Sequence, residues 1–114
     1  MPWQVEKVEF KGFTSCSGPI SDTVELSEHE VRKLVQHINC SVYMGPVTGE
    51  GCDSDYSFKV YLEDGTKIYF REAGSPRIEV NPQYGEKYWI YNKALSKYAK
   101  TLIEKYNLMV APPA

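Results

Sequence analysis

The stretch YSFKVYLEDGTKIYFRE, residues 56–72, contains two runs of alternating apolar residues on either side of an Asp-Gly pair. Alternation with a period of two is typical of β-strands, and an Asp-Gly turn between two such runs predicts an antiparallel hairpin. A two-residue turn would place the apolar residues of the two strands on opposite faces, whereas a three-residue turn at 63–65 places them on one face. We therefore predict a three-residue loop in which Gly65 has a positive φ.

This loop length also sets the register of the two strands. Each residue of the first strand then lies opposite one residue of the second, and the two side chains become neighbours on one face. The expected pairs are Phe58 with Phe70 and Val60 with Ile68 on the apolar face, and Lys59 with Tyr69 and Tyr61 with Lys67 on the other face.

Further strands are expected on both sides of the hairpin. In WQVEKVEFKGF, residues 3–13, the alternation changes phase between Val5 and Val8, which predicts a β-bulge at Glu6–Lys7. Short apolar patterns predict additional strands, at residues 20–26, 40–44, 77–80 and 88–91.

Two amphipathic helices are expected as well. Ser27 and Glu30 form the sequence pattern of a capping box, which predicts that the first helix begins just after Ser27. Asn92 is expected to cap the second helix. The apolar stripes, with helical spacing, are Val31, Leu34, Val35 and Ile38 on the first helix and Leu95, Tyr98, Ala99, Leu102, Ile103 and Tyr106 on the second.

The expected elements follow the order β-β-α-(β)-β-β-β-β-α, in which the parentheses mark the short segment 40–44 as an optional strand; without it the order is β-β-α-β-β-β-β-α. Strands joined by short turns imply an antiparallel sheet, and helices are needed to bury its apolar face. We therefore predict an α+β fold, with an antiparallel sheet of about five or six strands packed with two α-helices. The length fits one domain, which we take as residues 1–107, followed by a C-terminal tail at 108–114.

Charge is distributed unevenly along the chain. The net charge is −2 and the hydrophobic content is 42%, a composition that argues against disorder and gives no support for nucleic-acid binding. Residues 1–66 hold 5 basic and 11 acidic residues, whereas residues 67–114 hold 8 basic and 4 acidic residues. This asymmetry is either ordinary surface charge or the mark of a C-terminal half that meets an anionic partner.

The three cysteines, Cys16, Cys40 and Cys52, are an odd number and lack zinc-ligand spacing. We expect three reduced thiols in a cytoplasmic protein, or in the host cytoplasm if the protein is phage-encoded. The alternative is a Cys40–Cys52 bridge in an exported form whose signal has been removed. No apolar run is long enough to predict a membrane span.

The titratable residues do not form a recognisable catalytic pattern. His29 and His37 lack the helical spacing of a metal-binding pair, and Asp53 and Asp55 lack the glycine that a calcium loop requires. Paired carboxylates in hydrophilic turns rarely have the raised pKa that general acid catalysis needs. We therefore expect a protein that is not an enzyme and that uses no metal or cofactor.

Binding is better supported, because the chain contains nine tyrosines and two tryptophans. Tyrosine and tryptophan dominate interface hot spots. The strand YWIY, residues 88–91, is apolar on both faces, so either both faces are covered or one is exposed to a partner. The candidate binding residues are Arg71, Arg77, Tyr84, Tyr88, Trp89 and Lys93.

These features favour a small protein that binds a protein partner stoichiometrically, of the inhibitor, immunity or phage-encoded anti-defence type. The alternative is a ligand-binding or sequestering domain for an anionic small molecule such as a nucleotide. Homo-oligomerisation is compatible with either function. The segments LSEHEVRKL, VYLEDGTKIYF and YWIYNKAL also resemble small Gram-positive lipoprotein domains, which implies an extracytoplasmic domain as a further alternative.

Overall fold

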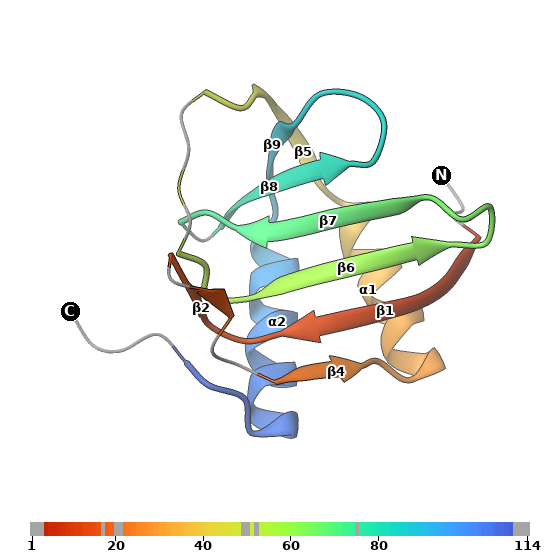
Figure 1. Ribbon diagram of the computed structural model, residues 1–114, viewed down its shortest axis with the longest axis vertical. Coiled ribbons are helices and arrows are strands. Elements are labelled where there is room, and N and C mark those ends of the chain that lie inside the picture. The colour runs from red at the N-terminus through yellow and green to blue at the C-terminus, as the bar shows by residue number, and fades with distance from the viewer. Residues whose placement is uncertain are drawn as a thin grey trace.

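The computed structural model describes residues 4–16, 18–19, 22–48, 51, 53–74 and 76–110. Its architecture is α+β, with an antiparallel sheet and two helices, as predicted (Figure 1). In chain order the elements are β1 (Val5–Lys11), β2 (Thr14–Ser15), β3 (Gly18–Pro19), β4 (Thr23–Glu25), α1 (Glu28–Ile38), β5 (Val42–Pro46), β6 (Ser57–Leu62), β7 (Lys67–Glu72), β8 (Arg77–Pro82), β9 (Tyr88–Tyr91) and α2 (Lys93–Tyr106).

The main sheet has seven strands in the order β4-β1-β6-β7-β8-β9-β5, and every neighbouring pair is antiparallel. Strands β6 to β9 follow one another as a meander, while β1 and β5 add to its two sides. The sheet therefore has somewhat more strands than the five or six predicted. Strands β2 and β3 pair separately as a two-stranded ribbon, which the sequence did not predict.

The central hairpin has the predicted three-residue loop. Phe58 lies opposite Phe70, and the N–H of Leu62 donates to the carbonyl of Thr66 at 2.9 Å. Gly65 has a φ of 90°, a conformation that favours glycine because it carries no Cβ. The predicted pairs on both faces of the hairpin are thus confirmed.

The predicted bulge in the first strand is also present. The register of β1 against β6 shifts between Val5 and Lys7. The extra residue lets Val5 and Val8 face the same side, so Val8 is fully buried and Val5 packs against the core. Lys7 therefore lies on the opposite face of the sheet.

The first helix begins at the predicted capping box. The N–H of Glu30 donates to Oγ of Ser27 at 3.2 Å, and the N–H of Ser27 donates to Oε1 of Glu30 at 2.9 Å. Leu34 and Ile38 are buried, and Val31 packs against the core from its edge. The capping residues thus fix where α1 starts, and its apolar stripe sets which face meets the sheet.

The second helix is capped by Asn92, which also joins the two helices. Its Oδ1 accepts from the N–H of Leu95 at 2.8 Å, and its Nδ2 donates to the carbonyl of His37 at 2.6 Å. The fully or largely buried residues on α2 are Leu95, Ser96, Ala99, Leu102 and Ile103.

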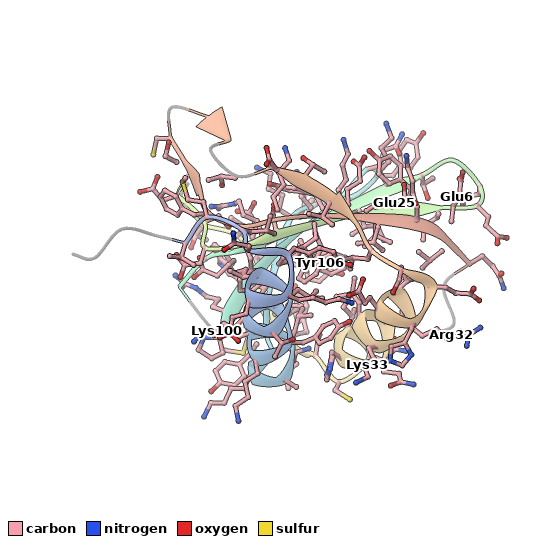
Figure 2. All side chains as sticks on the ribbon, turned by 90° about the horizontal axis from the view of Figure 1, so that it is seen from below. Glu6, Glu25, Arg32, Lys33, Lys100 and Tyr106 are labelled. Atoms are coloured by element: carbon pink, nitrogen blue, oxygen red, sulfur yellow. The ribbon has the colours of Figure 1, made fainter. Side chains whose placement is uncertain are left out.

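The molecule has two layers, because both helices lie against the same face of the sheet (Figures 1 and 2). Apolar side chains from the strands and helices meet between the layers and form one core. Its central members are Val8, Phe10, Leu34, Phe58, Val60, Phe70, Ile78, Val80, Ile90, Leu95 and Ala99.

The first residues of the predicted tail are anchored to the domain. The N–H of Leu108 donates to the carbonyl of Ile103 at 3.0 Å, and the N–H of Phe13 donates to the carbonyl of Met109 at 2.9 Å. Leu108 also packs against the core. Neither described helix is long and apolar enough to cross a membrane.

The predicted state of the thiols is wrong in one respect. Cys40 is free and exposed, but Cys16 is disulfide-bonded, so the chain does not hold three reduced thiols. The alternative Cys40–Cys52 bridge is also wrong because Cys40 is unbonded; Cys52 itself lies outside the described residues. An odd cysteine count argues against a closed framework but still allows one pair.

Candidate binding surface on the sheet

The face of the sheet turned away from the helices, called here the open face, carries polar and aromatic side chains. Figure 2 shows Glu25 on this side, while Lys33 and Lys100 project from the helices on the other. Side chains alternate along each strand, so the register defines which residues share the open face. They include Lys7, Glu9, Lys11, Glu25, Lys59, Tyr61, Lys67, Tyr69, Arg71, Arg77, Glu79, Asn81, Trp89 and Tyr91.

Basic residues outnumber acidic residues on the open face. With Glu6, which Figure 2 shows on the same side as Glu25, this face holds six lysines and arginines and four glutamates, a formal excess of two positive charges. The whole chain carries a net charge of −2, so the open face has the opposite sign. Such a local field attracts anionic groups even where the net charge of the protein would repel them.

Tyr61 lies at the centre of the most basic part of this face. Its ring centroid is 4.7 Å from Nζ of Lys7, 5.5 Å from Nζ of Lys59 and 5.6 Å from Nζ of Lys67. Its hydroxyl donates to Oε1 of Glu9 at 2.7 Å. We call these five residues the Tyr61 cluster. Cation–π attraction to the ring offsets part of the repulsion among three ammonium groups.

The register explains how residues distant in sequence form the cluster. Lys7 lies opposite Tyr61, and Tyr61 lies opposite Lys67 on the next strand. Lys59 precedes Tyr61 by two residues and therefore lies on the same face. The bulge in β1 is essential, since it puts Lys7 on the open face while Val5 and Val8 stay on the core side.

A hollow of about 410 Å³ adjoins the Tyr61 cluster. Lys59 and Glu9 belong to both features. A protein side chain could enter this hollow while a neighbouring group contacts the lysines. Its lining residues are Glu9, Lys11, Thr23, Ser57, Lys59, Tyr69 and Asn81.

A second hollow, of about 370 Å³, lies between the β7–β8 turn and the loop that follows β5. It brings together three of the predicted binding residues, Arg71, Arg77 and Trp89. Its other lining residues are Thr48, Gly51, Asp53, Ala73 and Gly74.

Arg71 forms a buried ion pair beneath this second hollow. Its Nη2 donates to Oε1 of Glu79 at 3.1 Å, and the two side chains are only 10% and 8% exposed. Its Nη1 also donates to the backbone carbonyl of Asp53 at 3.3 Å. Arg71 therefore holds the loop near Asp53 against the sheet, and much of its charge is neutralised by Glu79.

Arg77 lies over the indole ring of Trp89, with its guanidinium carbon 4.6 Å from the ring centroid. Its Nε donates to the carbonyl of Ala73 at 3.1 Å. Trp89 is half-buried, whereas the next residue, Ile90, is in the core. One face of strand β9 is thus core, and the other is covered in part by an arginine.

The remaining predicted binding residues lie away from both hollows. Tyr84 is 75% exposed in the loop between β8 and β9, and Lys93 is exposed at the start of α2. Tyr88 is half-buried on the helix side of the sheet, where its ring contacts Tyr43 at 5.6 Å. Burial, followed by the charge of Tyr43, raises the pKa of Tyr88.

Sequence reasoning missed the Tyr61 cluster as a site, although it predicted one contact within the cluster and one between the cluster and Tyr69. The Tyr61–Lys67 and Lys59–Tyr69 pairs were expected as cross-strand neighbours. The signal that could have identified the site is the alternation of lysine and tyrosine on the side of the hairpin that does not face the core.

The histidines and the acidic turns were examined in the sequence as candidate metal sites. Among the described residues there is no group of three or more histidine, cysteine or acidic side chains placed to hold a metal ion. His37 contacts the ring of Tyr98 at 5.1 Å, and burial lowers its pKa. Burial, followed by the charge of Glu72, raises the pKa of Asp55.

Strand β5 forms one edge of the main sheet and, among the described strands, pairs with β9 alone. Val42, Tyr43 and Met44 are each more than half exposed at this edge. Gly45 and Pro46 follow directly, and a bulge interrupts the pairing between Tyr43 and Gly45. Bulges and prolines limit the addition of a further strand to a sheet edge.

Comparisons of the chain with protein-family models, with curated proteins and with solved structures give no match.

Proposed function

We propose that this chain is a non-enzymatic binding protein that recognises an acidic protein partner through its open face. The observation that carries the proposal is that both helices cover one face of the sheet, while the other presents the ring of Tyr61 among three lysines. In this proposal the protein acts stoichiometrically, as inhibitors and immunity proteins do.

The composition of the open face supports a protein partner. Tyr61 and Tyr69 offer large, rigid contact areas with a polar tip, the kind of side chain that is enriched in hot spots. The hollow beside them gives the surface relief into which a partner side chain can pack. A flat sheet face without a hollow or large aromatic side chains would offer little shape complementarity to a specific partner.

The charge of the open face supports an acidic partner. Lys7, Lys59 and Lys67 concentrate positive charge around one ring, and Glu9 is the acidic residue that contacts that ring's hydroxyl. Carboxylates of a partner would relieve the mutual repulsion of the ammonium groups. Complementary charge of this kind mainly raises the rate of association and selects the partner.

The test compares two double charge reversals of equal size. Lys59→Glu/Lys67→Glu alters the open face, whereas Lys33→Glu/Lys97→Glu alters exposed positions on the two helices. Tagged wild type and both variants are used to recover partners from cells that naturally contain the protein. The proposal expects a partner that binds wild type and the helix variant but is lost from the open-face variant.

The recovered partner is then purified and titrated calorimetrically with each protein. We expect a one-to-one complex with wild type and at least a tenfold weaker complex with the open-face variant. Equal binding by both variants, or selective loss with the helix variant, would refute recognition through the open face. Thermal unfolding of each variant establishes that any loss of binding is not a loss of folding.

A further inference from the structure

We propose that the hollow formed by Arg77, Trp89 and the β7–β8 turn is a separate binding site for a carboxylate group, held by the guanidinium of Arg77. This inference does not rest on the proposed protein partner. It rests on how Arg77 is oriented, on the space in front of it and on the charges around it.

Arg77 is held so that its outer donors are available to a ligand. Its planar group lies over Trp89, and its Nε is bonded to the carbonyl of Ala73. Within the described part of the chain, its two terminal nitrogens have no hydrogen-bond acceptor. A guanidinium fixed in this way presents parallel N–H groups, a geometry that matches the two oxygens of a carboxylate.

Gly74 keeps the space beside the guanidinium open. A Cβ at this position would lie 3.9 Å from Nη2 of Arg77, so any side chain there would begin in contact with the guanidinium group. The φ of Gly74 is 89°, which itself favours glycine in the turn. The hollow of about 370 Å³ falls within the size range of small-molecule sites, roughly 300–1,000 Å³.

The neighbouring charges favour a carboxylate over a phosphate. Arg71 lines the same hollow, but it is already paired with Glu79. Asp53 also lines the hollow and contributes a negative charge, although one of its oxygens accepts the N–H of Cys16 at 2.9 Å. One available arginine neutralises a singly charged carboxylate, whereas a doubly charged phosphate would keep an uncompensated negative charge beside Asp53.

The experiment uses benzoate as the probe, with benzamide as its uncharged counterpart and inorganic phosphate as the competing oxyanion. Binding is followed through the indole N–H resonance of Trp89, which NMR distinguishes from that of Trp3 by its loss in Trp89→Phe. We expect saturable shifts with benzoate and at least tenfold weaker binding for both benzamide and phosphate.

Two substitutions and one control locate the site. Arg77→Ala should weaken benzoate binding at least tenfold, and Arg77→Lys should restore little of it because an ammonium cannot form the paired bonds. Lys33→Ala, which removes an exposed charge on α1, should leave binding unchanged. Arg77 is itself exposed, and unchanged amide resonances elsewhere in the spectrum would show that the variants remain folded.

A short peptide ending in phenylalanine, tested as the free acid and as the amide, distinguishes the source of the carboxylate. Tighter binding of the peptide acid than of benzoate would assign the site to a polypeptide C-terminus, and the reverse order to a small free carboxylate. The proposal is wrong if benzoate leaves the Trp89 resonance unmoved, if phosphate binds as tightly, or if Arg77→Ala binds benzoate normally.

Discussion

The carboxylate of Glu30 on α1 accepts a hydrogen bond of 2.6 Å from the hydroxyl of Tyr106 on α2. The same carboxylate accepts from Nζ of Lys105 at 2.6 Å and from the N–H of Ser27 at 2.9 Å. Burial raises the pKa of Glu30, but these bonds outweigh it and lower the pKa from 4.5 to about 2. One buried carboxylate thus caps the first helix and joins it to the second.

Glu30 should make stability depend on pH in the acid range. Its folded-state pKa lies below the unfolded value, so its contribution is complete above pH 4.5 and disappears as pH falls toward 2. The difference in unfolding free energy between wild type and Glu30→Gln should be on the order of 3 kcal/mol at pH 7 and about half that near pH 3. Urea unfolding at several pH values measures it.

Glu28→Gln is the matched control. Glu28 is in the same helical turn and pairs with Arg32 at 2.7 Å, but both side chains are mostly exposed. Its substitution should change the pH profile very little. A Glu30→Gln profile that runs parallel to that of wild type would show that Glu30 titrates normally in the folded protein.

The loop of the central hairpin gives a second prediction. Gly65→Val should lower the unfolding free energy by more than about 1 kcal/mol, because a β-branched residue resists a φ of 90°. Space does not explain such a loss, since no atom lies within 4 Å of a Cβ built at Gly65. Gly51→Val is the control: that site is equally open, and its φ lies outside the positive range. Similar denaturation midpoints for the two variants would contradict the strain argument.

The buried pair of Arg71 and Glu79 gives a third prediction. Glu79→Ala should cost roughly 3 kcal/mol of stability because it leaves the arginine buried and unpaired. Replacing both residues, as Arg71→Met/Glu79→Leu, should cost much less than that single change. Chemical denaturation of the two variants decides the point. If the double variant is the less stable one, the ion pair stabilises the fold more than apolar side chains of similar size would.

The cysteines should differ in reactivity. Without reductant, a thiol reagent should modify Cys40 in the folded protein but leave Cys16 unmodified, because Cys16 is disulfide-bonded. After reduction and unfolding both should react. Peptide mapping by mass spectrometry identifies the modified positions. Labelling of Cys16 in the unreduced, unfolded chain would contradict the disulfide.

Local patterns in the sequence were sufficient for both helices, for the strands of the main sheet and for the hairpin register, but not for the β2–β3 ribbon. The pairing of Phe58 with Phe70 could be predicted because two alternating runs and one turn constrain each other. The bulge in β1 could be predicted because Val5 and Val8 break the alternation within a few residues. In both cases the residues that determine the geometry are close together in the sequence.

Long-range pairing could not be predicted in the same way. Lys7 reaches Tyr61 only because β1 pairs with β6, and nothing near residue 7 indicates that partner. Arg77 and Trp89 were both predicted as binding residues, but their contact depends on the register of β8 against β9. The disulfide at Cys16 was missed for the same reason, since a cysteine's partner is set by the fold.

The last prediction compares alanine substitutions at two adjacent residues of β9, Trp89 and Ile90, which should differ in their cost to stability. Ile90 is 4% exposed in the core, so Ile90→Ala should cost about 2–5 kcal/mol of stability through the lost burial and the cavity left behind. Trp89 is half-buried under Arg77, so Trp89→Ala should cost less. If the indole is an interface hot spot, the same substitution should weaken binding of the purified partner by about 2 kcal/mol. Normal partner binding by Trp89→Ala, together with a stability loss as large as that of Ile90→Ala, would instead assign Trp89 to the architecture of the sheet.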